Sequence, residues 1–204
     1  MIEVKAFSGT QIEPYLDAVA ALRIVVFRDW PYLYDGDRSY EANYLATYAR
    51  SPQSLFVLAL DGERVIGAST GIPLADESDN FRKPFLERDI AEHDVFYFGE
   101  SVLLREYRGR GLGHRFFDER ENYALTGGFH LTAFCAVERD AHDARRPENY
   151  VPNDAFWRKR GYRRQDDMFC AIEWREVDAA SACTHALRFW LRPLEQGGVR
   201  PDHD

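Results

Sequence analysis

The feature that most constrains this chain is an apolar segment that runs directly into a basic, glycine-rich turn. Residues 95–104 read Val-Phe-Tyr-Phe-Gly-Glu-Ser-Val-Leu-Leu, a pattern typical of a buried strand. Residues 105–114 then carry glycine at positions 109, 111 and 113. From Leu112 onward, apolar residues recur at helical spacing. The segment therefore predicts a strand, a tight turn and the N-terminus of an amphipathic helix.

Such a turn has the chemistry of a phosphate site. Glycine allows positive φ angles and lets a ligand come close to the backbone. The free N–H groups of a helix's first turn, aided by the helix dipole, favour an anion. Arginines surround the turn, at Arg105, Arg108, Arg110 and Arg115. We predict a pyrophosphate cradle here, and the alternative is a basic surface turn that only joins strand to helix.

Two common phosphate motifs do not fit the turn. A P-loop needs Lys-Ser or Lys-Thr after its last glycine, whereas His114 follows Gly113. A dinucleotide fingerprint needs Gly-x-Gly-x-x-Gly, and the glycines here are spaced two apart. Residues 108–113, Arg-Gly-Arg-Gly-Leu-Gly, instead resemble the acetyl-CoA signature of the GNAT superfamily of N-acetyltransferases, Arg/Gln-x-x-Gly-x-Gly/Ala. Residues 153–162 are similar to a second, somewhat longer block of that family.

Composition limits the other classes. The 204 residues are 45% hydrophobic and 14% aromatic, which predicts one globular domain over 1–204. The net charge of −8 argues against a nucleic-acid-binding protein. No apolar run is long enough for a membrane span, and residues 1–5 lack the features of a signal peptide. The three cysteines lie in apolar runs without metal-ligand spacing, so we expect buried free thiols, no metal and a cytoplasmic location.

Periodicity along the chain predicts alternating strands and helices. Strands are expected over 2–7, 55–60, 64–72, 95–104, 130–137, 168–174 and 186–194, and helices over 12–29, 39–48, 112–126 and 153–160. An irregular, substrate-side insertion is expected at about 73–94 and a frayed tail from about 196. The resemblance implies an α/β (α+β) fold: a mixed, strongly bent sheet of about six to seven strands with helices on both faces.

The resemblance also implies an activity. A GNAT protein moves an acetyl group from acetyl-CoA to a primary amine by direct transfer in a ternary complex, without a metal. The resemblance implies a small-molecule or peptide amine as the acceptor, of unidentified structure, and it is compatible with a homodimer. Three alternatives stay open at this stage: transfer of a larger acyl group, acetylation of protein amino groups, and a non-catalytic acyl-CoA-binding sensor.

Direct transfer needs a base for the amine, and Glu100 is the candidate. It lies in an otherwise apolar strand immediately before the turn, where burial would raise the pKa of a carboxylate toward neutrality. A structural glutamate bonded to a neighbouring strand or an arginine is the equal alternative. A thiolate leaving group also gains from an acid. The family's usual tyrosine, aligned on Gly161, is Trp157 here, so Tyr150 or solvent would take that role.

The remaining site residues follow from the resemblance. Backbone groups of Val102, Leu103 and Leu104 are expected to pair with pantetheine like an added strand. Asn153 either contacts the pantetheine arm or only caps a helix. The pyrophosphate would be held by Arg108, Gly109, Arg110, Gly111, Leu112, Gly113 and His114.

Two further groups of residues have alternative readings. The aromatic residues between 30 and 48 either pack two helices against a loop or line an acceptor pocket. Cys135, with His130 or His142, could suggest a nucleophile, but its position inside a continuous apolar strand favours core packing.

Overall fold

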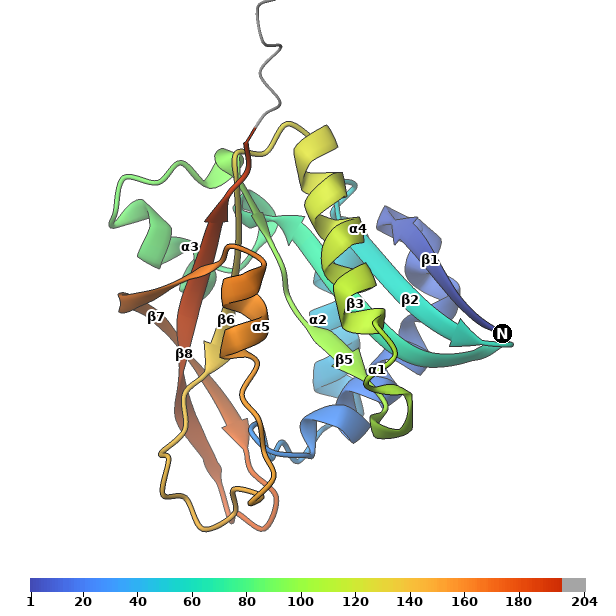
Figure 1. Cartoon of the computed structure of the whole chain (residues 1–204), viewed down its shortest axis with the longest axis vertical. Helices are drawn as coiled ribbons and strands as arrows, with labels where there is room; N and C mark the ends of the chain where they lie inside the picture. Colours follow the sequence, from blue (N-terminus) through green and yellow to red (C-terminus); the bar gives the residue numbers. More distant parts are fainter. Residues whose placement is uncertain (196–204) are drawn as a thin grey trace, which may run out of the picture.

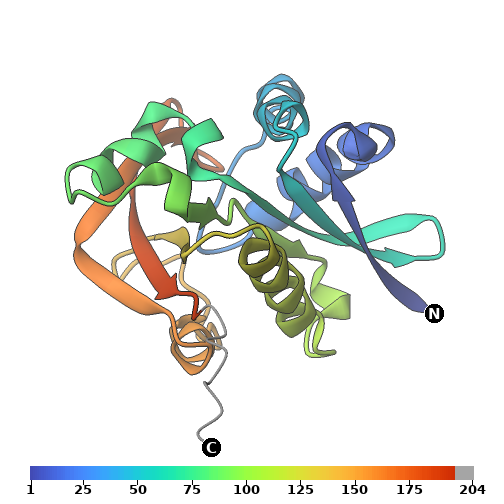
Figure 2. The same cartoon turned by 90° about the horizontal axis from the view of Figure 1, so that it is seen from above.

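Eight strands form one sheet that carries helices on both faces (Figures 1 and 2). This computed structural model describes residues 1–195, so the tail expected from about residue 196 lies outside the described residues. The strands are β1 (Ile2–Ser8), β2 (Leu55–Asp61), β3 (Arg64–Pro73), β4 (Val95–Tyr97), β5 (Ser101–Leu103), β6 (Leu131–Val137), β7 (Arg163–Arg175) and β8 (Ala182–Pro193). The helices are α1 (Leu16–Phe27), α2 (Arg38–Arg50), α3 (Asp79–Leu86), α4 (Leu112–Thr126) and α5 (Asp154–Lys159).

The strands follow the order β1-β2-β3-β4-β6-β8-β7, and β5 pairs with β3. The β4–β6 pair is parallel and the other pairs are antiparallel. The β2–β3 hairpin turns at Gly62 and Glu63, directly after Asp61, and an Asp-Gly pair is a favoured hairpin signal. The expected mixed sheet between helices is therefore confirmed, with eight strands where about six to seven were expected.

The additional strand arises because residues 95–104 do not form one continuous strand. Phe98 N–H donates to the carbonyl of Ala133 (2.8 Å), and the next amide, Gly99 N–H, donates to Thr70 instead (3.2 Å). A Cβ at Gly99 would lie 2.4 Å from Tyr48 Oη and 2.6 Å from Thr70 Oγ1, so only glycine fits. Beyond this break β5 is paired with β3, and β6 is paired with β8. The strands β5 and β6 therefore diverge, and a wedge opens between them.

The two faces of the sheet have separate cores. Helices α1, α2 and α3 cover one face with residues such as Leu22, Leu45 and Phe85. Helix α4 covers the other face with Phe116 and Phe117, and α5 lies on the same side as α4 (Figures 1 and 2). Within the described residues, no helix has the length and apolar character needed to cross a membrane.

Two expected elements differ from the structure. The segment 73–94, expected to be irregular, contains helix α3, whose Phe81 and Phe85 are buried one turn apart. Polar residues on its outer face hide that helical spacing in the sequence. The first long helix begins at Leu16 because residues Gly9–Tyr15 form a 3-10 turn that contains Pro14.

Candidate active site

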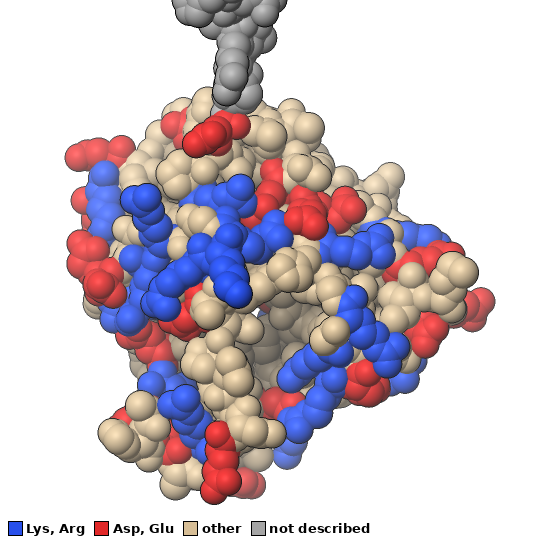
Figure 3. Space-filling model, viewed as in Figure 1, with Lys and Arg blue, Asp and Glu red and all other residues tan. Residues whose placement is uncertain are grey.

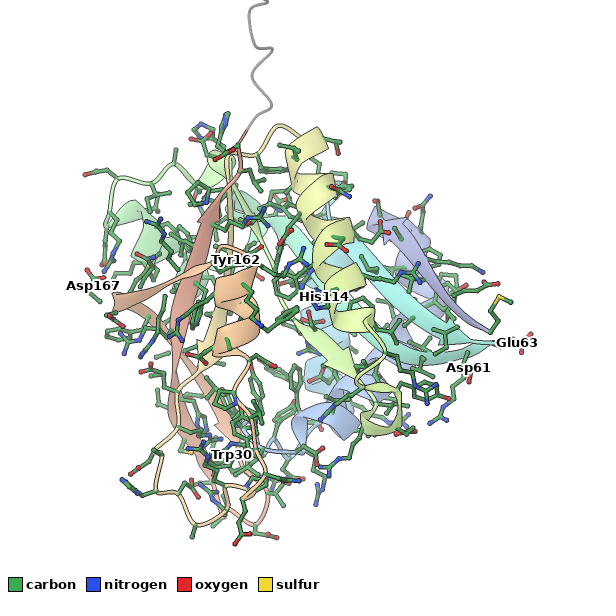
Figure 4. The ribbon with its side chains drawn as sticks, in the orientation of Figure 1. Trp30, Asp61, Glu63, His114, Tyr162 and Asp167 are labelled. Carbon is green, nitrogen blue, oxygen red and sulfur yellow. The ribbon has the colours of Figure 1, made fainter. Side chains whose placement is uncertain are left out.

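The wedge between β5 and β6 is a cleft of about 1120 Å³. One wall consists of β5 and the start of α4, and the opposite wall of β6, α5 and the loop between them. The segment 26–33 closes one end, where Trp30 lies (Figure 4). In Figure 3 the cleft is a hollow in the middle of the face, with Lys and Arg side chains on both sides. The site is large enough for an extended cofactor.

The glycine turn lies at the mouth of this cleft. Gly111 is the N-cap of α4 and has a left-handed backbone, with φ of 79°. The N–H groups of Leu112 and Gly113 belong to the first turn and precede the first N–H groups that donate within the helix, those of His114 and Arg115. Gly113 lines the cleft, and a Cβ on it would meet nothing within 4 Å among the described atoms. Amides without a helical acceptor beside open space have the chemistry that a phosphate site needs, and the cradle stays a prediction.

The side chains of the turn are only partly directed at the cleft. Arg108 lines it and donates from Nε to the Leu103 carbonyl (3.2 Å). Arg110 folds back on the turn and donates to the Glu106 carbonyl (3.1 Å). Leu112 is buried. The His114 ring lies between α4 and α5 and contacts Phe156 with 4.8 Å between ring centroids (Figure 4).

The backbone N–H and C=O groups of successive residues along β5 point alternately toward β3 and toward the cleft. Thr70 N–H donates to the Glu100 carbonyl and Leu104 N–H donates to the Ile66 carbonyl, each at 3.0 Å. Because antiparallel pairs alternate, Val102 also directs its backbone toward β3, while Ser101 and Leu103 direct theirs away from it. Among the three residues expected to pair with pantetheine, Leu103 is thus the one with backbone groups facing the cleft.

Glu100 lies at the apex of the wedge with a buried side chain. Its Oε2 is 2.6 Å from Arg23 Nη1 and accepts a hydrogen bond from the Tyr44 hydroxyl (3.1 Å). Its Oε1 is buried and has no hydrogen-bond partner among the described residues. Glu100 is therefore bonded to an arginine, as in the structural alternative given above. This ion pair leaves the second carboxylate oxygen, Oε1, uncommitted.

Two buried arginines around this apex were not singled out from the sequence. Arg23 of α1 lies between Glu100 and Glu41, with its guanidinium 4.2 Å from the Tyr44 ring centroid. Although burial alone would lower the pKa of Arg23, Glu100, Tyr44 and Glu41 raise it, so it stays charged. Arg120 of α4 donates to the Thr70 and Glu100 carbonyls (3.2 and 3.1 Å). Burial lowers the pKa of Arg120 to about 10. Neither residue belongs to a short motif.

A second, smaller cavity of about 90 Å³ adjoins the cleft beyond Glu100. It shares Phe27, Tyr32, Gly99, Glu100 and Cys135 with the cleft. Its aromatic lining includes Tyr32, Tyr34, Tyr40, Tyr44 and Trp174. Within the aromatic segment 30–48, Tyr48 is fully buried in the core, whereas Tyr40 and Tyr44 line this cavity.

The opposite wall carries the other expected site residues. Tyr150 lines the cleft and packs edge-on against Trp30. Burial, then the Asp154 carboxylate, raise the pKa of Tyr150, so the phenol keeps its proton near neutrality. Trp157 also lines the cleft and packs against Trp190, with centroids 5.1 Å apart. Asn153 lines the cleft from the N-cap of α5, but its side chain makes no capping hydrogen bond.

A charged cluster fixes the segment that closes the cleft. Glu176 accepts from both Arg139 and Arg145, and Arg139 also donates to the Tyr32 carbonyl (2.7 Å). Glu176, Cys183 and His185 offer ligand atoms within 4.8 Å of one another. Because two guanidiniums already occupy the Glu176 carboxylate, this group of residues does not favour a cation.

The cysteines divide into two kinds. Cys135 and Cys170 are buried, with sulfurs 3.9 Å apart, and burial raises the pKa of the Cys135 thiol. A thiol of raised pKa is a poor nucleophile, which agrees with the core-packing interpretation of Cys135. Cys183 is exposed, contrary to the expectation that every cysteine is buried.

Comparisons with known proteins agree with this geometry. A family model described as the acetyltransferase (GNAT) family matches residues 20–147. No curated protein matches the chain. The chain is similar in fold to a candidate acetyltransferase from Acinetobacter baylyi ADP1, with a TM-score of 0.62 and 13% identity over 100% of this chain and 98% of that one.

Two further solved structures are similar in fold. One is ribosomal-protein-alanine N-acetyltransferase from Brucella melitensis, with a TM-score of 0.58 and 15% identity over 93% of this chain and 99% of that one. The other is an N-acetyltransferase from Thermoplasma acidophilum in complex with coenzyme A, with a TM-score of 0.57 and 14% identity over 95% and 99%. At such low identity these likenesses concern the fold.

Proposed function

The chain belongs to the GNAT acetyltransferase family, and we propose that it transfers the acetyl group of acetyl-CoA directly to a primary amine in a ternary complex. The observation that carries this proposal is the cleft itself. It opens where β5 and β6 separate, has the glycine turn at its mouth and contains Glu100 at its apex.

The residues along the cleft fit the parts of acetyl-CoA. The amides of Leu112 and Gly113, beside the Arg108 guanidinium, suit the pyrophosphate. The outward-facing backbone of Leu103 suits an amide of the pantetheine arm, which would extend the sheet by a strand-like pairing. Asn153 faces the same cleft from the opposite wall. Acetyl-CoA supplies the activated acetyl group when bound.

Glu100 is the proposed base. An ammonium is not nucleophilic, so the acceptor must lose a proton before its nitrogen attacks the acetyl carbonyl. The uncommitted Oε1 of Glu100 is the acceptor for that proton, directly or through a water molecule. The bonds from Arg23 and Tyr44 to Oε2 hold the carboxylate in a fixed orientation. As the C–N bond forms, the C–S bond breaks, and Tyr150 is proposed to protonate the departing sulfur.

The test is an acetyl-transfer assay on a panel of primary amines, with the acetylated product measured by mass spectrometry. We expect intersecting double-reciprocal kinetics and no acetyl adduct on the protein. Glu100→Gln should lower kcat by about 10²- to 10⁴-fold with little change in acetyl-CoA affinity. A Tyr150→Phe variant should also lower kcat. Parallel double-reciprocal lines with a covalent acetyl-protein would contradict direct transfer.

A further inference from the structure

The small cavity beyond Glu100 has an unusual charge for a buried space. Its lining contains two carboxylates, Glu41 and Glu100, and one guanidinium, Arg23. All three residues are less than 9% exposed, with Glu41 at 0%. Arg23 bonds to both carboxylates. With both carboxylates ionised, this trio has a net charge of −1, so one further cation would balance it.

The unpaired atoms point to the same conclusion. Glu41 Oε1 is buried without a hydrogen-bond partner among residues 1–195. A buried carboxylate oxygen without a donor is costly, because it has lost its water without gaining a bond. An ammonium group has three donors and no acceptor, so it satisfies such an oxygen and the missing charge together.

The remaining lining suits a cation as well. Tyr32, Tyr34, Tyr40, Tyr44 and Trp174 place their side chains around the cavity. Aromatic faces attract cations, and Arg23 already uses Tyr44 in this way, at 4.2 Å. Burial raises the pKa of Tyr44 and of Tyr34, so both hydroxyls stay neutral and add no competing charge.

The position of the cavity then defines the acceptor. Glu100 borders both the cleft and the small cavity, so a molecule that enters the cavity passes the proposed base. With a volume of about 90 Å³, the cavity holds a compact group and not a peptide segment. We propose that the acceptor is a short diamine, with one ammonium held in this cavity while its other amino group is acetylated in the cleft.

The chemistry balances with the groups named. The reacting ammonium loses two protons in forming the amide; one passes by way of Glu100 to solvent, and the CoA sulfur leaves carrying one proton. The ammonium in the cavity remains charged throughout. This inference rests on the proposed transferase function, but it makes a separate claim about specificity.

The test compares three acceptors of similar size: 1,4-diaminobutane, 1-aminopentane and 4-aminobutanoate. Replacing the second amino group by a methyl group keeps the size and removes the charge together with its three N–H donors. We expect kcat/KM for the diamine to exceed that for 1-aminopentane by at least about tenfold, and 4-aminobutanoate to be the poorest. In Glu41→Gln the ratio of diamine to 1-aminopentane should fall toward one. The matched control is Glu63→Gln, in the exposed β2–β3 turn at the far side of the molecule (Figure 4), which should keep the parent ratio.

The outcomes separate the two proposals. Equal kcat/KM for the diamine and 1-aminopentane would overturn the cavity assignment and leave the transferase proposal intact. If acetyl-CoA binds but no amine is acetylated, the transferase proposal fails. Calorimetry of 1,4-diaminobutane with the CoA-bound protein then decides whether the cavity binds a diamine. Binding that weakens in Glu41→Gln supports the assignment, and no binding by the parent overturns it.

Discussion

Single side chains determine how much of the cleft is available for chemistry. Glu100 commits one oxygen to Arg23 and Tyr44 and leaves the other uncommitted. The ion pair fixes the carboxylate, and the second oxygen can then receive a proton without any rearrangement of the site. The same pair explains why Arg23 tolerates burial, since its charge is matched on both sides by Glu100 and Glu41.

Gly113 offers a prediction at this scale. Its φ is not in the left-handed region and a Cβ there would meet nothing within 4 Å, so alanine fits the free protein. Gly113→Ala should keep or raise the free energy of unfolding, by up to about 1 kcal/mol, because alanine is the better helix former. The added methyl group would lie where a phosphate approaches the helix. Calorimetry should therefore show at least about a tenfold weaker affinity for acetyl-CoA.

The control for that substitution is Asn122→Ala, on the exposed side of the same helix. It should raise helix stability similarly and leave acetyl-CoA affinity unchanged. Parent-like affinity in Gly113→Ala would contradict the cradle at the start of α4.

At the scale of elements, the break between β4 and β5 creates the site. The two strands separate because Gly99 passes against Tyr48 and Thr70, and Arg120 of α4 satisfies carbonyls that the break exposes. On the opposite wall, the long β7–β8 hairpin brings Glu176 to the loop after β6. The cleft is thus held open by the buried Arg120 on one side and by the partly buried Arg139 on the other.

The Glu176 cluster gives a pH-dependent prediction. Although burial opposes it, hydrogen bonds from Arg145 and Arg139 lower the pKa of Glu176 below its ordinary value of 4.5. A carboxyl whose pKa is lower in the folded protein stabilises the fold above its unfolded pKa, and this stability is lost on acidification. Glu176→Gln should therefore cost about 2 kcal/mol of unfolding free energy at pH 7. The difference from the parent should shrink below about pH 4.5.

Urea unfolding between pH 3.5 and 7.5 measures this difference. The exposed Glu63→Gln variant serves as the control, because it should follow the parent at every pH. A constant deficit for Glu176→Gln across the whole range would mean that the ion pairs are not its cause.

For the molecule as a whole, local patterns predict most of the elements. The glycine turn, the following helix and the β2–β3 hairpin are determined by short-range chemistry, so 108–126 and 55–72 were predictable. Contacts between residues that only the tertiary fold brings together were not predictable from the sequence. Arg23, Glu41 and Glu100 come from three separate elements, and no spacing in the sequence brings them together. The break at Gly99 depends on Tyr48, which is 51 residues away.

The most direct test of this account is amide hydrogen exchange of the parent protein with and without saturating acetyl-CoA, at short labelling times. If acetyl-CoA binds between β5 and β6, exchange should slow on both walls, over residues 99–116 and 134–157, while β1 and the β2–β3 turn remain unchanged. Unchanged exchange on these walls, or protection confined to another part of the molecule, would contradict the assignment of the cleft as the acetyl-CoA site.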